Sequence, residues 1–162
     1  MNPAQVSLLL CCMLVTFVTG SIHSFSVFLV PFEELLGLSR ADISLFYSFA
    51  LVFLTVSVLF GYLVYDRLRP AVLVAGACLG AGAGLVLSAY GNSWAQVFLG
   101  YSVLFGLANG VAYGYVLQLS GRALPDHKGF AMAAVTAAYA VGSVVFSYVL
   151  GRWSNPFPWP VH

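Results

Sequence analysis

The sequence predicts an all-α membrane protein with about five transmembrane helices. Five long apolar stretches fill nearly all of the 162 residues, and every Lys, Arg, Asp and Glu lies outside the centres of these stretches. The composition agrees, because 61% of the residues are hydrophobic and only 7% are charged, whereas about 25% are charged in an average soluble domain. A hydrocarbon core about 30 Å thick takes roughly 20 apolar residues in a helix, and lipid leaves an unpaired backbone without hydrogen-bond partners.

The spans are expected at residues 7–30, 43–65, 71–90, 94–120 and 130–150, which together make one transmembrane bundle over residues 1–151. The breaks between them hold the Pro, Gly, Asn and charged residues that interrupt helices. Each break is too short to be a domain. Residues 152–162 are expected to form a short Pro-rich tail that is too short to span.

The distribution of cations predicts the orientation of the bundle. Arg67 and Arg69 lie in the second break, and Arg122 and Lys128 lie in the fourth. Because Lys and Arg beside short loops are retained on the cytoplasmic side, both breaks are expected inside the cell. The N-terminus is then cytoplasmic and the C-terminus lies on the opposite side.

The first span has an alternative interpretation as a secretory signal peptide. Residues 8–18 resemble the apolar region of such a segment, and Thr19, Gly20 and Ser21 resemble its cleavage site. The flank lacks the usual positive charge, and the apolar run continues through Phe32. Cleavage would leave the orientation of the other four spans unchanged, so the charge distribution does not decide between the two interpretations.

Several functional classes are disfavoured by the sequence. A net charge of +1 provides no basic surface for nucleic acid. Cys11, Cys12 and Cys78 have no spacing typical of a metal site. The sequence contains neither a Gly-x-Ser-x-Gly turn nor a His-Glu-x-x-His pair, and Tyr65-Asp66 has no Gly-x-Gly-Asp partner. We therefore expect no enzyme, no metal, no cofactor and no nucleic-acid partner.

Glycines recur every four residues in the third and fourth spans. The positions are Gly76, Gly80 and Gly84 in the third span and Gly106, Gly110 and Gly114 in the fourth. This spacing places them on one helix face and predicts close approach of neighbouring helix backbones.

Polar residues form stripes with helical spacing in three of the spans. They are Thr16, Thr19, His23 and Ser26 in the first span, Ser102, Asn109 and Tyr113 in the fourth, and Thr136, Tyr139, Ser143 and Ser147 in the fifth. Because such groups are costly in lipid, they are expected to face the bundle interior or a water-filled path. Interhelical hydrogen bonding is the expected role of the Ser and Thr residues, whereas His23 and Asn109 favour a cavity. His23 is the one titratable group within a span whose charge can change near neutral pH.

Two blocks of sequence resemble a known transporter family. The first runs through Ile22-His23-Ser24-Phe25-Ser26-Val27-Phe28, Pro31, Leu38-Ser39-Arg40-Ala41-Asp42-Ile43 and Asp66-Arg67. The second runs through Gly106-Leu107-Ala108-Asn109-Gly110, Tyr113, Leu124-Pro125-Asp126-His127-Lys128-Gly129-Phe130-Ala131 and Gly142. Together they resemble the oxalate/formate antiporter family and its monocarboxylate-transporter relatives within the major facilitator superfamily.

The resemblance implies a fold and a function. It implies an incomplete six-helix half of a major facilitator fold that lacks the sixth helix. It also implies alternating-access transport of a small organic anion, a monocarboxylate or dicarboxylate, by exchange or symport. Besides the lipid bilayer and this substrate, a second transporter half or a second copy is an expected partner.

The resemblance also implies roles for individual residues. The expected substrate path is lined by His23, Phe25, Asn109, Tyr113 and Tyr139. Asp66, Arg67 and Arg122 are expected to form a cytoplasmic gate, and the alternative is a solvated loop that only sets topology.

Some positions depart from the family pattern. The loop after the second span has Tyr62 and Arg69 where the superfamily usually has glycine, and Gly61 stands one residue early. Ser102 lies near the place of an Arg that is typical of proton-coupled drug exporters, which favours organic anions. A channel and a non-transporting membrane partner remain as alternatives to a transporter.

Overall fold

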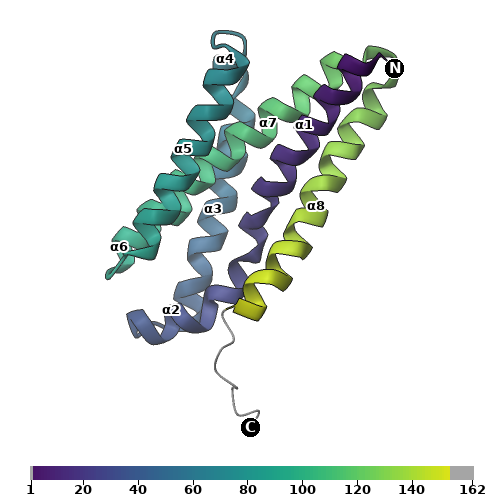
Figure 1. Cartoon of the computed structure of the whole chain (residues 1–162). Coiled ribbons are helices and arrows are strands. Elements are labelled where there is room, and N and C mark those ends of the chain that lie inside the picture. Colours follow the sequence, from purple (N-terminus) through teal and green to yellow (C-terminus); the bar gives the residue numbers. More distant parts are fainter. Residues whose placement is uncertain (1, 154–162) are drawn as a thin grey trace.

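The computed structural model describes residues 2–153 (Figure 1). Its elements are α1 (Pro3–Thr19), η1 (Gly20–Phe28), α2 (Leu29–Leu36), α3 (Arg40–Phe60), α4 (Tyr62–Tyr65), α5 (Pro70–Ala89), α6 (Trp94–Val97), η2 (Phe98–Phe105), α7 (Gly106–Ala123), η3 (Pro125–His127) and α8 (Lys128–Trp153). Elements η1 and η3 are 3₁₀-helices, and η2 is a π-helix. The predicted Pro-rich tail, from residue 154 onward, lies outside the described residues.

Five helical stretches within the described residues are long and apolar enough to cross a membrane. They are Pro3–Leu36, Arg40–Phe60, Pro70–Ala89, Trp94–Ala123 and Pro125–Arg152. The predicted all-α membrane fold with five spans is therefore confirmed. Many apolar side chains face outward, and Leu79 at 75% exposure is an example. Such side chains suit contact with lipid.

The first membrane-crossing stretch is longer than the sequence predicted. The expected break at Pro31 does not occur, because Pro31 lies in the first turn of α2, where its missing N–H removes no α-helical hydrogen bond. The helix ends instead at Gly37, whose φ of 62° is left-handed and whose N–H bonds to the carbonyl of Glu33. A second predicted boundary also differs, since α3 ends at Phe60 and a turn at Gly61 precedes the short α4.

The turn at Gly61 retains close packing although the glycine stands one residue early. A methyl group on Gly61 would overlap the ring of Tyr65. Tyr65 is 4% exposed, and its hydroxyl donates to the carbonyl of Val111 at 3.4 Å. The Tyr65 ring thus covers the turn and joins it to α7.

The stretch Trp94–Ala123 lies at the centre of the bundle. In its most apolar window 56% of the residues are buried, compared with 22% to 28% in the other four stretches. It packs against α3, α1, α5 and α8, and α1 also packs along α8 (Figure 1). The N-terminus, α4 and the start of α8 lie at one end of the bundle, and α2 and α6 lie at the other (Figure 1).

The glycine stripe of the fourth span mediates close packing, as predicted. A Cβ on Gly106 would lie 2.7 Å from the carbonyl oxygen of Ala50 on α3, and a Cβ on Gly110 would overlap the backbone of Leu54. In the third span Gly84 also lies close to η2, because a Cβ on Gly84 would lie 2.6 Å from the carbonyl oxygen of Gly100. The prediction was wrong for Gly76, which has open space around its Cβ position because it faces outward.

An apolar groove runs between the first membrane-crossing stretch and α5, with the fourth stretch as its floor. Three cavities of about 220, 210 and 250 Å³ follow each other along it. Their α5 residues run from Pro70 in the first cavity to Ala89 in the third. The groove therefore follows α5 over its whole length, which is about 30 Å at 1.5 Å per residue.

Candidate functional site

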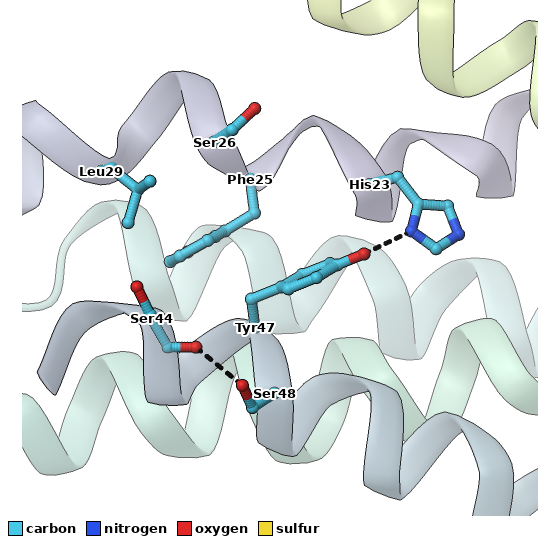
Figure 2. Close-up of a pocket in the computed structure, with 7 residues that line it drawn as sticks. All are labelled: His23, Phe25, Ser26, Leu29, Ser44, Tyr47 and Ser48. Carbon is cyan, nitrogen blue, oxygen red and sulfur yellow. Dashed lines mark hydrogen bonds between the residues drawn. The ribbon is translucent and has the colours of Figure 1, made fainter. Parts of the chain in front are cut away.

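His23, on η1, faces α3 across a small cavity (Figure 2). Its Nδ1 lies 2.6 Å from the hydroxyl oxygen of Tyr47. The cavity has a volume of about 200 Å³ and is lined by His23, Phe25, Ser26, Leu29, Ser44, Tyr47 and Ser48. None of these lining residues is Asp, Glu, Lys or Arg. His23 is therefore the lining side chain whose charge can change near neutral pH.

The hydrogen-bond donors of the cavity are few. The hydroxyl of Ser44 donates to the carbonyl of Arg40 at 2.7 Å, and that of Ser48 donates to the carbonyl of Ser44 at 3.1 Å. Both hydroxyl protons are thus used within α3. When Tyr47 donates to Nδ1 of His23, the ring proton lies on Nε2. Nε2 has no hydrogen-bond partner within the described part of the chain, and it lies on the side of the ring away from Tyr47 (Figure 2).

A wall of aromatic and polar side chains continues from His23 to α7 and α8. The rings of His23 and Tyr139 meet edge to face with centroids 5.2 Å apart, and the rings of Tyr139 and Tyr113 lie 4.8 Å apart. The hydroxyl of Tyr139 donates to the amide oxygen of Asn109 at 3.4 Å. Phe25 lines the cavity itself. The structure therefore brings together all five residues that were expected along the substrate path.

Asn109 is more deeply buried than the half-buried His23, Tyr113 and Tyr139. It is 1% exposed, and its amide nitrogen donates to the carbonyl of Thr19 at 2.7 Å. Thr16 is similarly buried, and its hydroxyl lies 3.0 Å from the carbonyl oxygen of Val135 on α8. The predicted role of Thr residues in interhelical hydrogen bonding is confirmed at Thr16.

The residues of the expected cytoplasmic gate are only partly brought together. Nη1 of Arg122, near the end of α7, lies 2.9 Å from Oδ1 of Asp66, which follows α4. Both side chains are more than 60% exposed, at 63% and 67%. Arg67 is also exposed and has no ion-pair partner among residues 2–153. The contact connects the C-terminal ends of α4 and α7.

Metal-binding groups were also sought in the structure. The described residues contain no group of three or more His, Cys, Asp or Glu side chains that could hold a metal ion.

Comparison with known proteins identifies the family. The family model of the Major Facilitator Superfamily matches residues 2–160. The chain belongs to the major facilitator superfamily. An MFS-type transporter of Aspergillus fumigatus, AFUA_1G00970, is 29% identical over 157 residues, which is 93% of this chain and 36% of the relative. An uncharacterized MFS-type transporter of Escherichia coli, YhjX, is 26% identical over 137 residues, which is 82% of this chain and 33% of the relative.

The chain spans about one third of the length of these major facilitator relatives. Membership in this superfamily, together with the five apolar helices, makes the protein an integral multi-pass membrane protein. The names of both relatives agree with this family and specify no substrate.

Sequence reasoning missed two residues of the candidate site, Tyr47 and Tyr101. The hydroxyl of Tyr101 donates to the carbonyl of Ile22 at 2.8 Å, and Tyr47 bonds to His23. A signal for Tyr47 exists, because Ser44, Tyr47 and Ser48 follow three- and four-residue steps. No such stripe marks Tyr101.

Proposed function

We propose that this chain takes part in transmembrane transport of a small organic anion by alternating access, as a partial transporter of the major facilitator superfamily. The proposed substrates are monocarboxylates or dicarboxylates such as oxalate, formate and lactate. The resemblance of residues 21–70 and 106–142 to the oxalate/formate antiporter and monocarboxylate-transporter families supports this substrate class. The mechanism involves binding and rocking of helices, without covalent chemistry.

The observation that carries the proposal is the imidazole of His23 in a cavity without acidic lining residues. A cavity of about 200 Å³ is smaller than the roughly 300–1,000 Å³ of sites for drug-sized ligands. It therefore suits a small solute. A protonated His23 offers a positive charge and an N–H at Nε2, and both favour a carboxylate oxygen.

The pH dependence of binding follows from the groups that face His23. These are Tyr47 from α3 and Tyr139 from α8, and neither carries a negative charge while its hydroxyl is protonated. Protonation of the imidazole strengthens binding of an anion, and deprotonation weakens it. Binding is therefore expected to weaken as pH rises through the titration of His23.

The first test is transport by the purified chain in liposomes. Exchange of labelled oxalate, formate or lactate across the bilayer would support transport by the chain alone. If flux with the purified chain stays at background and the chain co-purifies with a longer transporter, transport by the chain is contradicted.

The second test is His23→Ala, with His127→Ala as the matched control on the exposed η3 segment. A hydrogen bond to a charged group contributes about 1.5–3 kcal/mol, so His23→Ala is expected to weaken binding roughly tenfold or more. It is also expected to flatten the pH profile, whereas His127→Ala leaves both unchanged. Unchanged binding and pH profile in His23→Ala would assign His23 to helix packing.

A second candidate function is that of a non-transporting membrane partner that associates with a full-length transporter. The apolar groove along α5 favours it, because a groove of membrane-spanning length with small lining residues such as Ala77, Ala81 and Gly82 suits another helix. Co-purification with a longer transporter whose flux changes in the presence of the chain would support this function. Flux by the chain alone would contradict it.

A further inference from the structure

We propose that Tyr101 and Asn109 are positioning residues for His23. Their side chains hold the backbone just before His23, at Thr19 in α1 and at Ile22 in η1, and they thereby set the position of the imidazole against Tyr47. This inference rests on the proposed function only in assigning His23 to the substrate. The geometry itself is independent of that assignment.

The helix geometry of η1 is unusual. Nine consecutive residues, Gly20–Phe28, form a 3₁₀-helix within a membrane-crossing stretch. Runs of 3₁₀-helix longer than three or four residues are uncommon because their hydrogen-bond geometry is poorer than that of an α-helix. The surroundings of η1 must therefore stabilise it.

The position of His23 depends on this geometry. A 3₁₀-helix turns by about 120° and rises about 2.0 Å per residue, whereas an α-helix turns by about 100° and rises about 1.5 Å. If the three residue steps from Gly20 to His23 changed from 3₁₀ to α-helical geometry, the His23 side chain would rotate by roughly 60° and shift along the helix axis by about 1.5 Å. The contact between Nδ1 and Tyr47, at 2.6 Å, would not survive such a displacement.

Two side chains of the fourth stretch bind carbonyls at the start of this segment, one within η1 and one on Thr19, the last residue of α1. Tyr101 on η2 donates its hydroxyl to the carbonyl of Ile22 at 2.8 Å, and Asn109 on α7 donates its amide to the carbonyl of Thr19 at 2.7 Å. Both donors are buried, at 5% and 1% exposure. Water is therefore a poor substitute for either bond.

The same two residues act on His23 through its neighbours. Asn109 accepts a hydrogen bond from Tyr139, whose ring packs against the imidazole. The ring of Tyr101 packs against Phe25 with centroids 4.7 Å apart. Neither Tyr101 nor Asn109 is among the residues that line the His23 cavity. Their influence on a ligand there passes through η1 and Tyr139.

The direct test reads the imidazole itself. The chain has three histidines, so selective ¹⁵N-histidine labelling gives few signals, and His23→Gln assigns that of His23. Tyr101→Phe removes only the hydroxyl and is expected to change the Nδ1 and Nε2 shifts of His23, as is Asn109→Leu. The matched control Tyr65→Phe removes a buried hydroxyl that donates to a carbonyl of α7 and leaves η1 untouched. Unchanged His23 shifts in folded Tyr101→Phe would overturn the inference.

A binding experiment tests whether the residues act through His23. Affinity for oxalate, formate and lactate is measured for Tyr101→Phe, His23→Gln and the double variant, with thermal unfolding of each as a control for folding. Tyr101→Phe is expected to weaken binding severalfold, and the double variant is expected to bind no more weakly than His23→Gln. Additive losses would contradict positioning through His23. Absence of binding to the unmodified chain would contradict the proposed substrate, while the ¹⁵N shifts still decide the positioning role.

Discussion

The contact between α3 and α7 and the hydrogen bonds that join residues 19–22 to η2 and α7 depend on different interactions. Along α3, the glycines Gly106, Gly110 and Gly114 bring two backbones together by surface fit. Around η1, the side chains of Tyr101 and Asn109 donate to backbone carbonyls. Van der Waals packing is not directional, whereas a hydrogen bond fixes one register. The comparison suggests that the second contact fixes the candidate site and that the first mainly holds the helices together.

The largest effect is expected from filling the glycine contact. A Cβ on Gly110 would overlap the backbone of Leu54 and lie 2.7 Å from Cβ of Ser57, so Gly110→Ala is expected to destabilise the protein by about 1–3 kcal/mol. Gly76→Ala is the matched control, because its Cβ position is open, and it is expected to stabilise the helix by about 0.5–1 kcal/mol. Unfolding in mixed detergent, followed by circular dichroism, measures both. Equal effects would show that the α3–α7 contact tolerates a side chain.

A smaller effect is expected where η2 packs against α3. Ser102 on η2 is fully buried and donates to the carbonyl of Phe46 on α3 at 2.8 Å. Ser102→Ala is expected to cost about 0.6–2 kcal/mol, the range for interhelical hydrogen bonds in membranes. Ser88→Ala, which removes a hydroxyl that is also buried, at 4% exposure, but bonds within its own helix, is the control and is expected to cost less. If the two variants unfold alike, Ser102 does not fix the register of α3.

The smallest effect on stability is expected at the C-terminal ends of α4 and α7. The ion pair of Asp66 and Arg122 is more than 60% exposed on both sides, and such pairs contribute at most about 1 kcal/mol. Asp66→Asn is therefore expected to change the unfolding free energy by less than about 1 kcal/mol and only at low salt. A gate would show itself as changed flux with unchanged stability. Asp126→Asn, on the exposed η3 segment, is the control, and equal flux in the two variants would contradict the gate.

The fold could be predicted from sequence because lipid imposes few choices. Composition and length alone identify the five spans, because an apolar stretch of this length in lipid must pair its own backbone N–H and C=O groups, which a helix does. The glycine stripe from Gly106 to Gly114 was also readable, because its four-residue spacing defines a helix face. The outward orientation of Gly76 was not readable, since spacing does not say which neighbour a face meets.

For the candidate site, the sequence predicted which residues take part but not how they are arranged. His23 and Asn109 stood out because each is strongly polar within a span. The 3₁₀ and π segments left no sequence signal, because the order of apolar and polar side chains in a span does not fix the period of its backbone hydrogen bonds. Tyr101 and its bond to Ile22 depend on those segments. The roles of these residues in substrate binding stay predictions.

The groove along α5 places two native thiols where they can report its occupancy. Cys11 on α1 lines the first of its cavities and Cys78 on α5 lines the second, and both side chains are exposed. A lipid-soluble maleimide is therefore expected to label both walls of the groove without any engineered cysteine. Protection of both thiols from the maleimide would indicate that one long molecule, such as a helix, occupies the groove. Protection of only one thiol would indicate a shorter molecule.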